Sequence, residues 1–212
     1  MKSSVDVVGL GMSLVDLLHV VEEFPDGPGV TESDESRIMG GGPVPTALCA
    51  ASRLGANCAI IDRVGSDWKG DHVRNEYHQY GVDTAHIISE SGRSTSFSSA
   101  LVRERDGERH IVFSGGDFTP LKIEELPMKL LASARFLHLN GRHWPACIEA
   151  ARIVRQSGGR NSFDGGGGSL SGAIQGTAVF HRYFNSGARF CGKPVRNPRP
   201  GKTTRCSFGL GG

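Results

Sequence analysis

Asp16 stands out near the start of the chain as a side chain whose type and position could do chemistry. It follows an apolar run that ends in glycines, Val5–Gly11, which predicts a buried strand entering a tight loop. A carboxylate can accept hydrogen bonds from two vicinal hydroxyls of a polyhydroxylated ligand. Asp16 is expected at the carboxyl end of this first strand, where ligands of open α/β sheets bind. The alternative is that Asp16 caps a turn or a helix start, and these residues alone favour the cap.

A run of glycines, Gly40–Gly42, forms a second feature of this kind, directly before Pro43. Glycine allows the backbone to approach a ligand where a Cβ atom would clash. It also allows a loop to adopt a positive φ angle. Both explanations can hold for the same residues.

Other groups that could do chemistry lack the necessary pattern. The eight histidines show no metal-ligand spacing such as His-Glu-x-x-His, so we expect surface roles for them. The five cysteines contain no Cys-x-x-Cys pair for zinc and are too few for a disulfide framework. Those in apolar segments are expected to be small buried hydrophobes: Cys49, Cys58 and Cys147. Gly165–Gly168 matches a phosphate loop in composition only, without the Lys-Ser/Thr that ends such a loop.

The charged residues and glycines are distributed unevenly, which divides the chain into two segments of different composition. A hydrophobic content of 38% and a charged content of 22% are typical of a soluble globular chain. Seven of the 24 Lys and Arg residues lie after residue 164 and none of the 22 Asp and Glu residues does, so residues 1–164 carry 17 basic and 22 acidic side chains. Gly residues are also concentrated there, with 14 of 30 between Gly158 and Gly212. We therefore treat residues 169–212 as an anomalous basic, Gly-rich tail.

Apolar runs and glycine stops predict strands and helices that alternate along the chain. Strands are expected at 5–11, 58–61, 136–139 and from 161, and helices at 46–55, 68–80, 123–131 and 145–156. A hairpin with an Asp106-Gly107 turn is expected between 96–102 and 109–113. Alternation with short loops predicts a parallel sheet covered by helices, plus a small β excursion.

Five stretches in unbroken order resemble the motifs of the PfkB, or ribokinase-like, carbohydrate kinases. They are Gly9–Asp16, Gly40–Ala47 with its close at Arg53-Leu54-Gly55, Asp62–Gly70, Tyr80–Thr84 and Leu137–Gly141. The resemblance runs from Val5 to about Asp164. It implies an α/β fold, a Rossmann-type parallel sheet flanked by helices, with a small β lid from about 12–45 and 92–116. The domain would span 1–168 and be incomplete at its C-terminus.

By this resemblance, the acceptor sugar would be bound by Asp16, Gly41, Gly42, Thr46 and Asn140. Relatives usually carry Asn where this chain has Thr46, whose single hydroxyl implies a weaker contact or a different sugar. Asn140 stands where relatives often place an acidic or amide group, and its alternative role is that of a turn residue before Gly141. The hairpin at 96–113 would be part of the lid over the sugar, or else an ordinary exposed hairpin.

The second half of such kinases contributes the nucleotide site. Intact members are expected to use ATP and Mg²⁺, and to carry a Gly-Ala-Gly-Asp segment whose aspartate is the catalytic base. Residues 165–212 contain no such segment and no Asp or Glu. Phosphoryl transfer depends on positioning and electrostatic stabilisation. We therefore expect the printed chain to bind sugar weakly and to lack phosphorylation activity.

The tail has an explanation at the level of the gene. The genetic code allows a choice of codons for residues 169–193 that has a second meaning when the reading frame is shifted forward by one nucleotide. The shifted frame then encodes a charged amphipathic helix followed by an apolar strand and another helix start. We predict that 169–212 is out-of-frame translation, and we expect disorder from its Gly, Pro and Arg content. Sequencing of the coding DNA tests this, because an intact frame near Gly168 would contradict it.

The leading hypothesis is therefore ATP-dependent phosphorylation of a sugar or related hydroxylated metabolite, and the alternative is a non-catalytic sugar-binding or regulatory module. Nucleic-acid binding by the basic tail is disfavoured, because no RNA-binding motif accompanies the charges. The expected partners are a small-molecule sugar and, through the lid, a second copy of the chain. Neither a signal peptide nor a run of ~18 apolar residues is present, so no membrane partner is expected and a reducing cytoplasm is the predicted location.

Overall fold

A five-stranded parallel sheet forms the centre of the fold, in the computed structural model that describes residues 5–164. Its strand order is β5-β4-β1-β8-β9. The strands are β1 (Val7–Leu10), β4 (Cys58–Gly65), β5 (Asp83–Glu90), β8 (Phe136–Leu139) and β9 (Arg160–Phe163). Each pairs in parallel with its neighbours. Parallel strands need crossover connections, which explains why helices and longer loops separate most of these strands along the chain.

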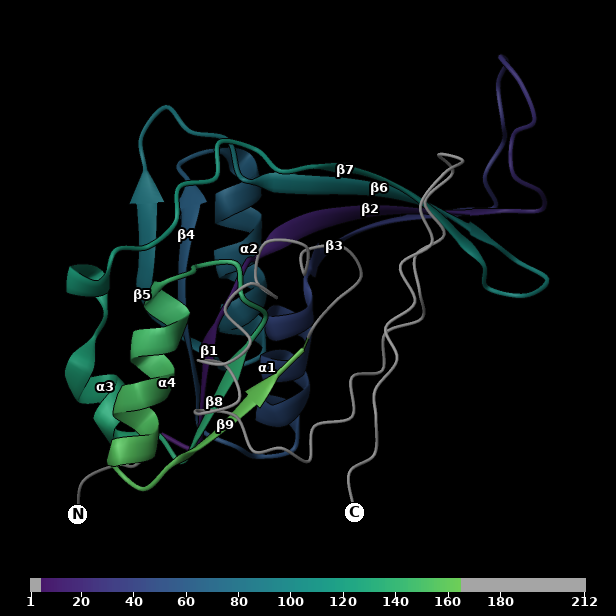
Figure 1. Ribbon diagram of the computed structural model, residues 1–212. Coiled ribbons are helices and arrows are strands. Elements are labelled where there is room, and N and C mark those ends of the chain that lie inside the picture. The colour runs from purple at the N-terminus through teal and green to yellow at the C-terminus, as the bar shows by residue number, and fades with distance from the viewer. Residues whose placement is uncertain (1–4, 165–212) are drawn as a thin grey trace, which may run out of the picture.

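Helices cover the two faces of this sheet (Figure 1). The helices are α1 (Pro43–Arg53), α2 (Trp68–Gln79), α3 (Met128–Ser133) and α4 (Ala146–Gln156). On one face, buried Leu137 and Leu139 pack with α3 and α4, whose Ala150 and Val154 are fully buried. On the other face, Ile60 packs with Val44 and Leu48 of α1 and with residues of α2. The predicted α/β architecture is confirmed.

A second, mixed sheet extends away from the first as a long ribbon (Figure 1). Its order is β3-β2-β6-β7, with β2 (Leu14–Val21), β3 (Glu35–Gly41), β6 (Ser96–Arg103) and β7 (Arg109–Ser114). β2 and β6 are parallel, whereas β2–β3 and β6–β7 are antiparallel. All four strands fall within the segments 12–45 and 92–116 that the sequence assigned to a lid.

Several element boundaries differ from those expected. The 123–131 helix is divided into a 3₁₀ turn, Ile123–Glu125, and α3, because Pro127 lies between them and proline disfavours helical backbone in the residue before it. α1 begins at Pro43 rather than Thr46, since proline is well suited to the first helical turn. β2, β3 and β5 were not predicted as strands. The described helices include none that is long and apolar enough to span a membrane, and the tail 169–212 lies outside the described residues.

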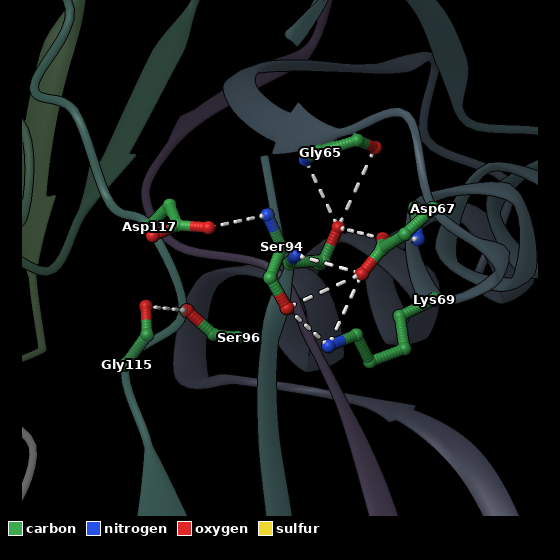
Figure 2. A network of polar contacts seen from close by, with 9 residues as sticks. Gly65, Asp67, Lys69, Ser94, Ser96, Gly115 and Asp117 are labelled. Carbon is green, nitrogen blue, oxygen red and sulfur yellow. Dashed lines mark hydrogen bonds and ion pairs between the residues drawn. The ribbon is translucent and has the colours of Figure 1, made fainter. Parts of the chain in front are cut away.

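Asp67 joins the two sheets at the point where α2 begins (Figure 2). Its carboxylate caps α2 by accepting a hydrogen bond from the Gly70 amide (3.0 Å). It also accepts hydrogen bonds from the Thr95 hydroxyl (2.6 Å) and amide (3.0 Å), and it pairs with the Lys69 ammonium at 3.1 Å. Thr95 directly precedes β6. The start of the second sheet is thereby fastened to the first helix turn of α2.

Replacing Asp67 with alanine should lower the free energy of unfolding by about 1–2 kcal/mol at pH 7, because a helix cap and bonds to Thr95 are lost together. Burial by itself would raise the pKa of Asp67, but the bonds from Thr95, Gly70 and Lys69 hold it at about 2, below its usual 3.8. A lowered folded-state pKa stabilises the fold above pH 3.8, and this contribution is lost as pH falls through 2. Urea unfolding at pH 7 and pH 2.5 checks this.

Asp71→Ala is the matched control, because Asp71 lies in the same helix turn and is exposed. We expect it to change stability less than Asp67→Ala at pH 7. The effect of Asp67→Ala should shrink at pH 2.5. An effect of equal size at both pH values would contradict the assignment.

Candidate functional site

Asp16 lies in the second sheet, so its predicted place at the carboxyl end of the first strand was wrong. β1 ends at Leu10, and residues 11–13 carry the chain into β2, where Asp16 is the third residue. The half-buried carboxylate accepts a hydrogen bond from the Ser98 hydroxyl on β6. A Cβ atom built on Gly41 of β3 would lie 1.9 Å from Asp16 Oδ2. Glycine at position 41 therefore makes room for this carboxylate.

The backbone conformation and a neighbouring carbonyl group both require glycine at position 42. Its φ angle is 112°, in the region that favours glycine, and it caps the N-terminus of α1. A Cβ atom on Gly42 would lie 2.5 Å from the Met12 carbonyl oxygen. The positive φ angle expected of the glycine run is therefore found at Gly42, where the close approach is to the backbone of residue 12.

Asn140 follows β8 at the carboxyl edge of the parallel sheet and is 9% exposed. Its Oδ1 atom accepts a hydrogen bond from the Arg142 amide at 3.3 Å, which is the geometry of a turn. A Cβ atom on Gly11 would lie 2.9 Å from the same oxygen. The Asn140 amide thus lies against the segment that leads from β1 to β2 and so to Asp16.

Thr46 is exposed on α1 and lines a cleft of about 270 Å³ between α1 and α2. Gly41 also borders this cleft, together with Glu76 and Tyr77 of α2. Asp16 does not line it. The fold therefore brings Asp16 and Gly41 into contact, with Gly42 next in the chain and Asn140 against Gly11, while Thr46 lies toward α2.

A buried pair that the sequence did not predict, Asp62 and His143, lies behind this edge. Both side chains are 0% exposed, with His143 Nε2 2.8 Å from Asp62 Oδ1. The Leu121 amide donates to His143 Nδ1 at 3.1 Å, which places the ring proton on Nε2, where it is donated to Asp62. Asp62 also accepts from the Ser13 amide at 2.6 Å and the Arg63 amide at 2.7 Å.

The surface role expected for the histidines was therefore wrong for His143. Asp62 interrupts the apolar segment Cys58–Val64, which was the one available signal of a buried acid. Nothing near His143 in the sequence indicated its burial, because its partner is 81 residues away. The pair fixes Ser13, three residues before Asp16, relative to the segment that follows Asn140.

Within the part of the chain that the structure describes, the cysteines are not activated as nucleophiles and form no metal centre. Cys58 and Cys147 are buried free thiols, as predicted, whereas Cys49 is only partly buried because it borders the cleft between α1 and α2. Burial raises the pKa of Cys58 to about 11 and that of Cys147 to about 12, so neither is a thiolate at neutral pH. Within residues 5–164 no group of three His, Cys, Asp or Glu side chains could hold a metal ion.

Comparison with known proteins decides the family. The model of the pfkB family carbohydrate kinases matches residues 2–165. The chain belongs to the pfkB family. Mouse (Mus musculus) ketohexokinase is 22% identical over 137 residues, which cover 65% of this chain and 46% of that protein. The nucleoside kinase of Methanothermobacter thermautotrophicus is 25% identical over 166 residues, 78% of this chain and 53% of that protein.

Solved structures agree on the fold of this pfkB family member. Arabidopsis thaliana ribokinase, in complex with ribose and ATP, superimposes with a TM-score of 0.63 at 17% identity. The match covers 78% of this chain and 55% of the ribokinase chain. The chain thus spans about half the length of the curated relatives it matches.

Proposed function

We propose that this chain is the acceptor-binding part of an ATP-dependent kinase that phosphorylates a sugar or related hydroxylated metabolite. Membership of the pfkB family supports the reaction class. The observation that carries the acceptor site is the Asp16 carboxylate, which lies against Gly41 where the second sheet joins the first. A carboxylate in such a place can accept two sugar hydroxyls. Gly41, Gly42, Thr46 and Asn140 complete the proposed set.

The second sheet is proposed to act as a lid over the acceptor and as the contact with a second copy of the chain. Large apolar side chains on its outer strands are exposed, among them Ile38 of β3 and Val112 of β7, at 53% and 65%. Exposed apolar patches of this kind favour association. Sedimentation should therefore detect a dimer, and replacement of Val112 with Glu should dissociate it.

Catalysis is proposed to require groups that the printed chain lacks. The sequence contains no Gly-Ala-Gly-Asp segment, and the described residues offer no carboxylate cluster that fits Mg²⁺. ATP, when bound, would supply the phosphoryl group. A coupled assay with ribose and fructose should therefore give no ATP-dependent turnover, and clear turnover would contradict this part of the proposal. The second candidate is a non-catalytic sugar-binding or regulatory module, which the contact between Asp16 and Gly41 also supports.

Replacing Asp16 with asparagine should weaken sugar binding at least about tenfold, because a charge-assisted acceptor is replaced by a neutral amide. Isothermal titration with ribose and fructose measures this. Asp26→Asn is the control, since Asp26 is an exposed loop residue and the charge change is identical. Sugar binding that is unaffected by Asp16→Asn, or equally affected by Asp26→Asn, would contradict the proposed site.

A further inference from the structure

Arg142 occupies a distinctive place, two residues after Asn140 at the carboxyl edge of β8. Its guanidinium lies over the Phe118 ring, 4.2 Å from the centroid. Phe118 belongs to the segment that returns from β7 and also contacts His143. Arg142 is therefore held where the second sheet rejoins the parallel sheet, on the edge at which ligands of open α/β sheets bind.

The guanidinium of Arg142 makes no ion pair within residues 5–164. Its Nε atom is buried and has no hydrogen-bond partner there. Burial lowers the pKa of Arg142, opposed by the charge of Asp62, whose oxygens are already occupied by three N–H donors. Arg63 provides the contrast, because its buried guanidinium pairs with both Glu90 and Glu125.

Arg142 is partly buried and has no counter-ion within residues 5–164, so a ligand of opposite charge would stabilise it. A guanidinium stacked on an aromatic ring keeps its N–H donors free at its edge, and their fork matches the oxygens of a phosphate. We propose that Arg142 binds a phosphate group of the ligand at the carboxyl edge of β8. The proposal deepens the proposed function, because Asn140 marks this edge as the acceptor side. The phosphate would belong either to a phosphorylated acceptor or to the nucleotide.

Isothermal titration of the full chain with ribose, ribose 5-phosphate, inorganic phosphate and ATP tests the proposal. At least one phosphate ligand should bind, and it should lose about tenfold or more in affinity in Arg142→Gln. Arg142→Lys should retain part of that affinity, since it keeps the charge and loses the fork. Arg135→Gln is the matched control, because Arg135 is exposed, pairs with Asp6 and carries the same charge. Its phosphate affinity should equal that of the unaltered chain.

The pattern across ligands separates the two sources of phosphate. A loss confined to ribose 5-phosphate assigns the site to the acceptor, and a loss confined to ATP assigns it to the nucleotide. Phosphate binding that is the same in Arg142→Gln as in Arg135→Gln overturns the inference, provided that circular dichroism shows both variants folded. If Arg142→Gln does not fold, Arg142→Lys decides. Phosphate affinity of Arg142→Lys equal to that of Arg135→Gln would overturn the inference that the forked guanidinium binds the phosphate. Arg142-dependent phosphate binding without any sugar binding would refute the proposed function and leave this inference standing.

Discussion

Replacing Asp62 with alanine should lower the free energy of unfolding by about 3–5 kcal/mol, because several buried N–H donors lose their acceptor together. The substitution removes the acceptor of three N–H groups, from Ser13, Arg63 and His143. Asp62 and His143 are both 0% exposed, so the three donors are shielded from bulk solvent and depend on the carboxylate. Urea unfolding followed by circular dichroism measures the change. The Asp62→Ala substitution should also weaken sugar binding, because it releases the Ser13 amide, and Ser13 lies three residues before Asp16.

Asp6→Ala is the control for Asp62→Ala. Asp6 also pairs with a basic side chain, Arg135, but the two are 30% and 65% exposed. Exposed ion pairs contribute little to stability, so we expect a small loss. Equal losses in the two variants would show that the Asp62 network contributes no more than a surface ion pair.

Replacing Gly70 with alanine should destabilise the fold by about 3 kcal/mol, at the upper end of the cost of overpacking. On helix propensity alone the same change in α2 would stabilise by about 1 kcal/mol, so the predicted sign is opposite. The reason is steric, because a Cβ atom on Gly70 would lie 2.1 Å from the Gly65 carbonyl oxygen. Backbone at the end of β4 would have to move, and the Asp67 cap lies between the two glycines.

Gly27→Ala isolates the steric part of this prediction. It adds the same methyl group at a loop position where nothing lies within 4 Å. Thermal unfolding should show a change within about 0.5 kcal/mol for Gly27→Ala. A stabilised Gly70→Ala variant would mean that helix propensity outweighs the contact with Gly65.

The sequence by itself determined the α/β class and the family. Strands β1, β4 and β8 and the helix α4 could be predicted because their apolar residues and terminal glycines or prolines are local signals. The hairpin of β6 and β7 followed from its Asp106-Gly107 turn. Five motifs in order then fixed the family to which residues 2–165 belong.

Strands β2 and β3 escaped prediction because their stability comes from neighbours in the sheet. All but the last two residues of β3 are exposed, so no apolar alternation marks it, and its pairing with β2 holds it in place. The predicted place of Asp16 was wrong for the same reason, since the motif Gly9–Asp16 contains the end of one sheet and the start of another.

Only the tertiary structure decided which of the chemically capable residues meet. Asp16 accepts its hydrogen bond from a residue 82 positions away, and Asp62 from one 81 positions away. A local pattern carries no information about such partners. The sequence therefore identified Asp16 as a candidate ligand of hydroxyl groups. The fold placed Asp16 against Gly41 in the second sheet and buried His143 against Asp62. It left Arg142 without an ion pair among residues 5–164 at the carboxyl edge of the parallel sheet, where residues distant in sequence meet.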